Sequence, residues 1–309
     1  MTTLYLSHPE CLDHQTLLGH PERADRLTVI ERALEEETFC NLLREAAPRG
    51  DETLALRVHP EDYVRDIYEA LPQEGTVSIA DDTVLSPGSW NAAMRALGAC
   101  SYAVDEVVAR KVDNAFCAIR PPGHHAELAK PMGFCLFNNA AVAARYAQQH
   151  HGLERVAIFD WDVHHGNGTQ DIFWADKSVL YLSTHEMPLF PGTGAARETG
   201  EHDTIVNVPL QAGDGSAIFR EALEVCVLPR LEAFSPDLII ISAGFDAHWR
   251  DPLANINLTE ADFVHTTRAV LNVASRRCGG RVVSILEGGY DLVGLSRSVA
   301  AHVSTLMHG

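Results

Sequence analysis

The segment from 160 to 168 carries the densest group of chemically active side chains in this 309-residue chain and reads Asp-Trp-Asp-Val-His-His-Gly-Asn-Gly. An apolar run that is typical of a buried strand precedes it. In an extended chain Asp160, Asp162 and His164 share one face, because side chains alternate with a period of two. Oxygen and nitrogen ligands at this spacing suit Zn²⁺ or Fe²⁺, and one further protein ligand would leave an open position for water.

Asp246 is the best candidate for that further ligand. It ends the most hydrophobic stretch of the chain, within Ser-Ala-Gly-Phe-Asp-Ala from 242 to 247. A buried carboxylate there is costly unless a cation or another partner compensates it. A single Asp in such a place more often caps a helix or binds loop amides. The density of Asp and His in this sequence favours a metal site instead.

Two adjacent histidines, His124 and His125, follow another strand-like stretch within Arg-Pro-Pro-Gly-His-His-Ala from 120 to 126. A turn rich in proline and glycine can present both rings to one cavity. If that cavity holds the metal, one imidazole can take a proton from water and return it to a leaving amine, which requires a pKa near neutrality. By contrast, His150 and His151 lie near the end of an expected helix and are interpreted as an ordinary surface pair.

Tyr290 lies in Glu-Gly-Gly-Tyr-Asp from 287 to 291, directly after a further apolar stretch. On a glycine-hinged loop its hydroxyl could donate a hydrogen bond to an oxyanion opposite the metal. A purely structural tyrosine is the equally common alternative.

The elements that must position these residues alternate between short apolar runs and longer helical patterns. Strands are predicted at 4–6, 114–120, 155–162, 178–185, 204–209, 237–243 and 281–287. Helices are predicted at 21–36, 61–70, 88–110, 138–150, 216–234, 259–276 and 292–306. Such alternation is typical of a parallel sheet with helices on both faces, whose ligands bind at the carboxyl ends of the strands. No repeat, low-complexity segment or linker interrupts it, so we expect one α/β domain over residues 1–309.

Composition narrows the class of protein. There are 42 Asp and Glu against 24 Lys and Arg, which gives a formal net charge of −18 and a sequence pI of about 5.2. This charge argues against direct nucleic-acid binding. The first ten residues lack the features of a signal peptide and no segment is apolar enough to span a membrane, so we expect no membrane partner and a cytoplasmic location. The seven cysteines contain no CxxC pair and are expected to be reduced.

Taken together, these residues resemble the histone deacetylase superfamily, and specifically its class II-like bacterial members. The resemblance implies the arginase–deacetylase fold, a single-domain three-layer α/β/α architecture with a mostly parallel central sheet. Its motifs run in the family's order along nearly the whole chain: Gly-His-Pro-Glu-Arg from 19, Val-His-Pro-Glu-Asp-Tyr from 58, Arg-Pro-Pro-Gly-His-His-Ala from 120, Gly-Phe-Cys-Leu-Phe-Asn-Asn from 133, the segment from 160 to 170, Phe-Pro-Gly-Thr-Gly from 190, Ser-Ala-Gly-Phe-Asp-Ala-His from 242 and Leu-Glu-Gly-Gly-Tyr-Asp-Leu from 286.

The resemblance also implies two kinds of cation site. Asp162, His164 and Asp246 would hold Zn²⁺, with Fe²⁺ as the alternative, and leave one position open. A structural K⁺ or Na⁺ would be held by Asp160 and Asp162 together with main-chain groups of His164 and the region of Ser183.

For catalysis, the resemblance assigns His125 as general base and then general acid, with His124 as electrostatic support. Tyr290 would polarise the scissile carbonyl and stabilise the oxyanion. Asp160 is expected to pair with His124 and Asn167 with His125. Asparagine at 167, where class I relatives carry aspartate, is the feature that points to class II.

For the substrate, the resemblance implies a narrow tunnel lined by Gly133, Phe134 and Phe190, with Leu253 at its rim and Asp82 near the substrate backbone. Aromatic walls suit the aliphatic stem of an acyl-lysine. The expected activity is zinc-dependent removal of acetyl or other short acyl groups from the Nε of lysine in proteins or peptides.

Other activities stay open at this stage. Acetylpolyamine amidohydrolases share the same catalytic residues and act on small acetylated amines, but Leu253 follows Asp251-Pro252 where polyamine-selective relatives carry a glutamate. An arginase-like binuclear manganese hydrolase is disfavoured, because the residues after Asp162 and Asp246 are mostly histidine, glycine and apolar. A non-catalytic acyl-lysine binding module would fit only if Tyr290 or a metal ligand were missing. The sequence does not determine the oligomeric state.

Overall fold

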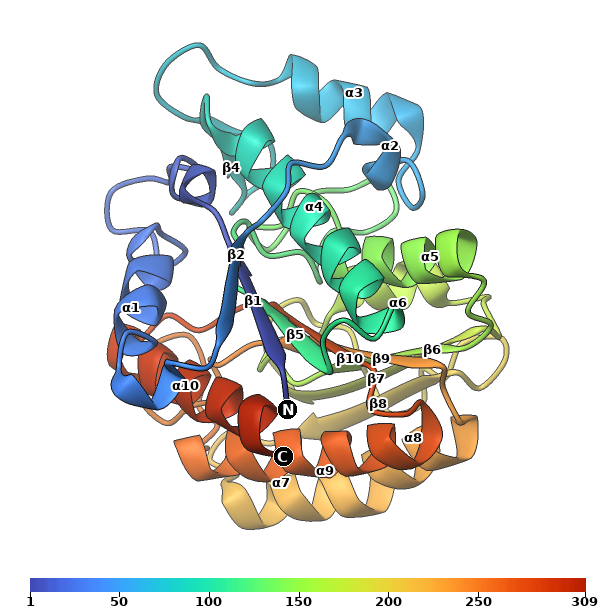
Figure 1. Cartoon of the computed structure of the whole chain (residues 1–309). Coiled ribbons are helices and arrows are strands. Elements are labelled where there is room, and N and C mark those ends of the chain that lie inside the picture. The colour runs from blue at the N-terminus through green and yellow to red at the C-terminus, as the bar shows by residue number, and fades with distance from the viewer.

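Eight parallel strands form the centre of the protein in the computed structural model, which describes residues 1–309 (Figure 1). In spatial order they are β2 (Leu43–Ala46), β1 (Thr3–Ser7), β5 (Asn114–Cys117), β10 (Val282–Leu286), β9 (Leu238–Ala243), β6 (Val156–Asp160), β7 (Val179–Glu186) and β8 (Ile205–Leu210). Every pair of neighbouring strands is parallel. A separate antiparallel pair joins β3 (Val77–Ser78) to β4 (Val84–Leu85).

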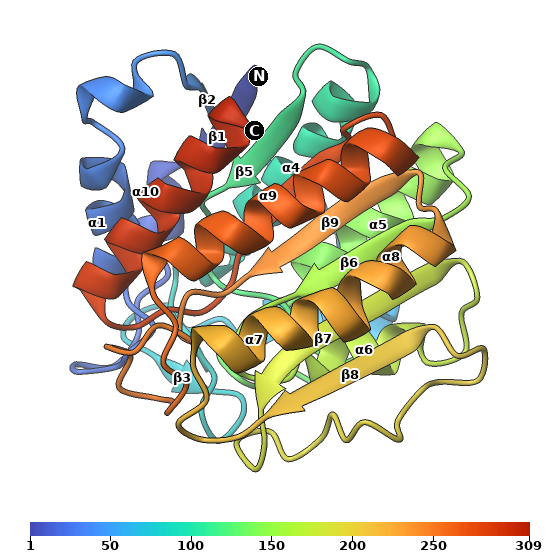
Figure 2. The ribbon, with the colours of Figure 1, turned by 90° about the horizontal axis from the view of Figure 1, so that it is seen from below.

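Helices cover both faces of this sheet. One layer, which Figure 2 shows in front of the strands, contains α1 (Asp25–Ala33), α7 (Ser216–Ala222), α8 (Leu228–Phe234), α9 (Glu260–Arg277) and α10 (Leu292–His308). The other side of the sheet carries α2 (Glu52–Ala55), α3 (Glu61–Glu69), α4 (Ser89–Val108), α5 (Asn139–His151) and α6 (Asn167–Phe173) (Figure 1). None of these helices combines the length and the apolar composition needed to cross a membrane.

The central strands β6, β9 and β10 are mostly apolar because both of their faces are buried. In β9, Ile239 and Ile241 join the core shared with α9 and α10. The preceding residue in each case points the other way, so Leu238 and Ile240 join the core shared with α4 and α5. Five of the seven cysteines are buried, and all seven are free thiols.

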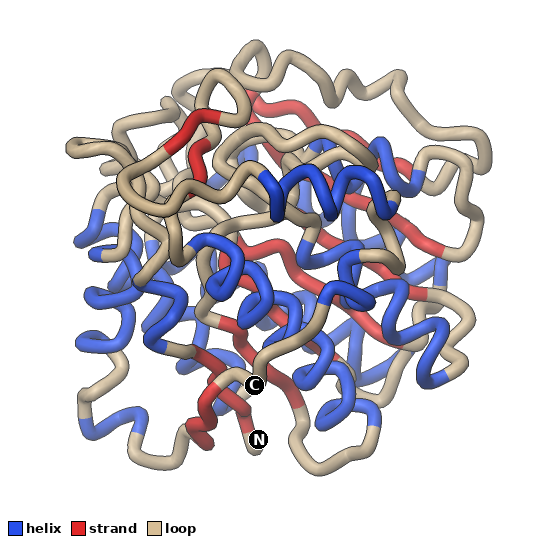
Figure 3. The backbone as a smooth tube through the Cα atoms, turned by 90° about the horizontal axis from the view of Figure 1, so that it is seen from above, coloured by secondary structure: helices blue, strands red, loops and turns tan.

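The carboxyl ends of the central strands are aligned, and this alignment creates the site. Asp160 of β6 pairs in register with Ser183 of β7 and with Ser242 of β9. β6 and β9 therefore end at nearly the same level, whereas β7 continues to Glu186. Figure 3 shows that the loops gather mainly on the side away from the two termini. Segments that are distant in sequence meet at this edge.

The architecture confirms the three-layer fold and all seven predicted strands, and the sheet is parallel throughout rather than mostly so. The predicted helix 21–36 is shorter in the structure, where α1 spans Asp25–Ala33, and Glu22 before it is buried and pairs with Arg26 and Arg120. The predicted helix 216–234 contains a π-helical turn, Leu223–Val227, just before Pro229, which has no N–H to donate. α9 begins with a capping box formed by Thr259 and Asp262.

Candidate active site

Asp162, His164 and Asp246 converge where β6 and β9 end. The Nδ1 atom of His164 lies 3.2 Å from Asp162 Oδ1 and 3.1 Å from Asp246 Oδ2. One donor atom from each of the three residues lies within 4.8 Å of the others, and all three residues are buried. The structure therefore brings together the three side chains that the sequence analysis assigned to a metal.

The surroundings of these side chains fit a cation. Burial raises the pKa of Asp246, and the neighbouring charge of Asp162 raises it further. Burial lowers the pKa of His164, but hydrogen bonds that Asp162 and Asp246 accept from its ring outweigh burial and raise the pKa to about 10, so the carboxylates favour positive charge at this point. A Cβ atom added to Gly244 or Gly288 would overlap the carboxylates, so only glycine permits this close approach. Two carboxylates and an imidazole are a donor set that Zn²⁺ accepts.

The two adjacent histidines face this centre as a pair, with ring centroids 4.0 Å apart. Nδ1 of His124 lies 3.0 Å from Asp160 Oδ2. Nδ1 of His125 lies 2.8 Å from Asn167 Oδ1. Both pairings expected from the resemblance are thus present in the geometry.

The two imidazoles have opposite electrostatic surroundings. Burial alone lowers the pKa of His124, but the carboxylates of Asp160 and Asp162 outweigh burial and raise it above its ordinary value. Burial lowers the pKa of His125, and the charges of His124 and His164 lower it further. His125 is therefore the neutral member of the pair and can accept a proton through its second nitrogen.

Glu287 holds the turn that carries both histidines, a role that sequence reasoning missed. Its Oε2 accepts hydrogen bonds from the backbone N–H groups of Gly123 (2.7 Å) and His124 (3.2 Å). Ser242 donates to its other oxygen at 3.1 Å. The sequence signal, an acid directly after an apolar strand, is the same signal that identified Asp246.

Tyr290 is held at the same centre by two residues to which the sequence analysis gave no role. Asp251 Oδ2 accepts a hydrogen bond from the Tyr290 backbone N–H at 2.7 Å. The Arg26 guanidinium lies 5.1 Å from the centroid of the Tyr290 ring and donates to the carbonyl oxygen of Gly289 at 2.7 Å. Burial, followed by the charge of Asp246, raises the pKa of Tyr290, so its hydroxyl keeps its proton.

A cavity of about 240 Å³ leads to these groups. Its lining residues are Asp82, His125, Gly133, Phe134, His164, Leu189, Phe190, Leu253 and Tyr290. All five residues predicted to bind the substrate are among them, and Leu189 is an addition. Asp82 Oδ1 accepts a hydrogen bond from the Gly133 N–H at 3.0 Å. A Cβ atom at Gly133, whose φ is +57°, would overlap the His125 ring, so glycine is required there as well.

The residues assigned to a monovalent cation lie together beside this centre. Asp160 Oδ1 accepts a hydrogen bond from the backbone N–H of Asp162 at 3.1 Å. Ser183 lies opposite Asp160 in the sheet register, and its hydroxyl pairs with His185 Nδ1 at 2.8 Å. The carbonyls of His164 and Ser183 as ligands of K⁺ or Na⁺ stay a prediction.

Comparison with known proteins identifies the family. Residues 20–306 match the histone deacetylase domain. The chain is 38% identical over 301 residues to a probable deacetylase of Archaeoglobus fulgidus, covering 95% of this chain and 83% of that protein. It is 44% identical over 253 residues to a histone deacetylase-like amidohydrolase of Pseudomonas aeruginosa, covering 81% of this chain and 66% of that protein. The crystal structure of the HDA15 HD domain superposes with a TM-score of 0.92 and 38% identity, covering 99% of this chain and 89% of that chain.

The architecture and these matches define an arginase–deacetylase fold. The chain belongs to the histone deacetylase family.

Proposed function

We propose that the protein is a zinc-dependent amidohydrolase that removes acetyl or other short acyl groups from the Nε of lysine in proteins or peptides. One observation carries this proposal: His125, His164 and Tyr290 line the same apolar cavity. An acyl-lysine stem could fill that cavity and bring its amide to these three groups.

Asp162, His164 and Asp246 are the residues that would hold the ion. When bound, Zn²⁺ supplies Lewis acidity and lowers the pKa of water. The buried carboxylates keep the site negative, and Gly244 and Gly288 leave it room.

The remaining chemistry belongs to side chains of the chain itself. Neutral His125 takes the proton of the attacking water at Nε2 and then delivers it to the amine that leaves. His124, held by Asp160, contributes positive charge beside it. The protonated Tyr290 hydroxyl donates a hydrogen bond to the oxygen of the scissile carbonyl as negative charge develops there.

The cavity wall supports a neutral acyl-lysine rather than a charged amine. Its mouth contains Leu189, Phe190 and Leu253, and Asp82 is the one carboxylate in its lining. Oxygen Oδ1 of Asp82 already accepts hydrogen bonds from Gly133 and from Thr83. A polyamine chain carries further positive charges, for which this mouth offers little compensation.

The deciding experiment compares kcat/KM of the zinc-loaded protein on acyl-lysine peptides with kcat/KM on N-acetylputrescine, N-acetylcadaverine and N8-acetylspermidine. We expect a preference for the peptides of about a hundredfold, which corresponds to about 2.7 kcal/mol in transition-state binding. The reverse preference would establish a polyamine deacetylase. The variant His125→Ala, which should retain zinc but lose most turnover, controls for a contaminating activity.

A further inference from the structure

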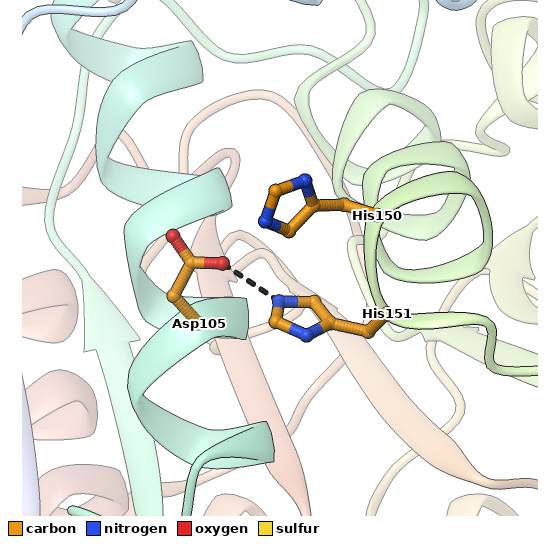
Figure 4. Close-up of side chains that lie close together, drawn as sticks. All are labelled: Asp105, His150 and His151. Atoms are coloured by element: carbon orange, nitrogen blue, oxygen red, sulfur yellow. Dashed lines mark hydrogen bonds and ion pairs between the residues drawn. The ribbon is translucent and has the colours of Figure 1, made fainter.

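A second group of metal-ligating side chains lies on the surface, away from the site described above. Asp105 comes from α4, and His150 and His151 end α5; Figure 4 shows both imidazoles directed toward the carboxylate. Nε2 of His151 lies 2.7 Å from Asp105 Oδ1, and one donor atom of each residue lies within 4.8 Å of the others. Two imidazoles and one carboxylate form a donor set typical of Zn²⁺.

Tyr146 orients all three side chains, as a supporting residue behind metal ligands does. Its hydroxyl donates to both oxygens of Asp105, at 3.0 and 3.1 Å. Its ring stacks on His150 with centroids 4.9 Å apart and an interplanar angle of 15°, and it meets the edge of His151 at 5.9 Å. His150 makes no hydrogen bond inside the protein, so its ring nitrogens are available to a ligand.

The local charge also favours a cation. His150 and His151 lie in the last turn of α5, where the partial negative charge of the helix dipole attracts positive ions. Arg57 carries a nearby positive charge that disfavours a cation, and its guanidinium lies 5.1 Å from the centroid of the Tyr146 ring. Ligand atoms around Zn²⁺ stand roughly 3.3 Å apart, which a small rotation of the exposed His150 ring would allow.

We infer that Asp105, His150 and His151 form a second binding site for a divalent transition-metal ion, Zn²⁺ in the first instance, which bridges α4 and α5. The two histidines would then be metal ligands rather than the ordinary surface pair that the sequence predicts. The site is independent of the proposed activity.

Zinc content after loading and extensive dialysis, measured by mass spectrometry, tests this inference. Wild-type protein should hold one more equivalent of Zn²⁺ than His150→Ala, and Zn²⁺ should raise the Tm of the Asp246→Asn variant, whose active site is impaired. His265→Ala, on the exposed surface of α9, should match wild type. Equal zinc content in wild type and His150→Ala would overturn the inference. So would an Asp246→Asn variant that folds but neither binds Zn²⁺ nor gains Tm.

A different observation carries an independent inference about the proposed reaction. Beyond His125, the hydrogen-bond chain continues through Asn167, whose Nδ2 donates to Glu127 Oε1 at 2.7 Å. Glu127 lies two residues after His125, in a turn closed by its N–H and the carbonyl oxygen of Lys130 at 3.0 Å. Asn167 opens α6.

Which group donates in each of these hydrogen bonds follows from the chemistry of the side chains. A carboxylate only accepts hydrogen bonds, whereas an amide presents a donor on one side and an acceptor on the other. Glu127 is the shortest and the only charged acceptor of the Asn167 NH₂ group, which also faces the His125 carbonyl oxygen at 3.5 Å and Met132 Sδ at 3.2 Å. It therefore holds the NH₂ group on its own side and turns Oδ1 toward His125. Nδ1 of His125 must then carry the hydrogen, which leaves Nε2 with the lone pair that a general base needs.

We propose that Glu127 is a positioning residue that sets the tautomer of His125 through the amide of Asn167. This proposal rests on the proposed function, because it assigns His125 the task of accepting a proton. Without Glu127 the amide could rotate and offer its NH₂ group to His125, which would favour the unproductive tautomer.

A set of matched variants tests this role through kcat, KM and zinc content. Glu127→Ala should lower kcat about tenfold or more while KM and zinc content change less than twofold. Glu127→Gln, whose carbonyl oxygen can still accept, should recover most of that loss. The Glu127→Ala/Asn167→Ala double variant should be no worse than Asn167→Ala alone, because both changes interrupt one chain.

Asp171→Asn is the control, since the Asp171 carboxylate anchors the same turn by accepting from the Leu128 N–H at 3.0 Å and makes no hydrogen bond to the Asn167 side chain. Its kcat should stay within twofold of wild type. A Glu127→Ala variant with unchanged kcat, or losses that multiply in the double variant, would overturn the proposal. If the wild-type protein turned over no substrate, the proposed function would fail, and the ¹⁵N chemical shifts of His125 in wild type and Glu127→Ala would still decide whether Glu127 sets the tautomer.

Discussion

The Arg26 side chain lies across the ring of Tyr290, with its guanidinium 5.1 Å from the ring centroid, although the two residues stand near opposite ends of the chain. The same guanidinium donates to the carbonyl oxygens of Gly289 and Glu287. Arg26 thus fixes both the glycine-hinged loop and the tyrosine that it carries. A residue of the first α-helix therefore positions Tyr290, the site residue nearest the C-terminus.

Replacing Arg26 by Met should therefore lower kcat by about tenfold or more with zinc content retained, because the Tyr290 hydroxyl loses its fixed position. Arg26→Lys keeps the charge but lacks the planar fork and should lie in between. Steady-state kinetics and zinc analysis check this expectation. A lower Tm with unchanged kcat would show that Arg26 supports the fold only.

Gly288→Ala should reduce zinc affinity and activity together. The added Cβ would overlap the carboxylates of Asp246 and Asp162 and force them apart. Zinc titration monitored with a competing chelator measures the loss, which we expect to exceed tenfold. Gly215→Ala, where the nearest atom to the new Cβ is 3.5 Å away, serves as the control. Equal zinc affinity in both variants would contradict the assigned ligand geometry.

The buried carboxylate of Glu22 should make stability fall in acid. Burial alone raises its pKa, but Arg120 and then Arg26 lower it from 4.5 to about 2. The charged form is thus favoured in the folded state, so the stabilisation is complete above about pH 4.5 and is lost as the pH falls toward 2. A shift of this size corresponds to about 3 kcal/mol.

Urea unfolding between pH 2 and pH 6 checks this expectation. Glu22→Gln should be less stable at neutral pH, because Arg26 and Arg120 lose their counter-charge, and its free energy of unfolding should vary less with pH. Glu221→Gln, at an exposed position on α7, should follow wild type. Parallel curves for Glu22→Gln and wild type would refute the assignment.

Leu253→Glu should shift substrate preference toward polyamines. Leu253 lies in the lining of the cavity, and a carboxylate there would attract the second cationic nitrogen of a polyamine. We expect kcat/KM for N8-acetylspermidine to rise about tenfold relative to an acetyl-lysine peptide, or about 1.4 kcal/mol. Leu253→Gln separates the effect of charge from that of shape. An equal shift in both variants would assign the preference to shape.

The sequence predicts the central strands well because a strand buried on both faces must be largely apolar, as β9 is from Leu238 to Ile241. It misses β2 because that strand lies at the edge of the sheet, carries Arg44 and Glu45, and depends on pairing with β1. It misses α6 because Asn167, Gly168 and Gln170 are buried beside the site, so no apolar stripe marks the helix.

The candidate site likewise contains residues that the sequence predicts and residues that it does not. Asp246 stands out as a charge at the end of an apolar strand, and Glu287 carries the same mark but has a different task, which its hydrogen bonds to Gly123 and His124 reveal. Which backbone groups an acid holds depends on contacts between distant segments. The buried pairing of Arg26 with Glu22 and Gly289 likewise becomes visible only when the chain is folded.

The adjacency of β6 and β9 has a consequence for the unfolded chain. His164 and Asp246 are 82 positions apart in sequence and meet only because these two strands are neighbours. An ion bound by both side chains would cross-link the two ends of the long segment between them. By the chain-entropy estimate for a covalent cross-link, closing a loop of this length reduces the conformational entropy of the unfolded ensemble, which raises its free energy by about 4–5 kcal/mol. The same three ligands would then protect the sheet against unfolding as well as support hydrolysis.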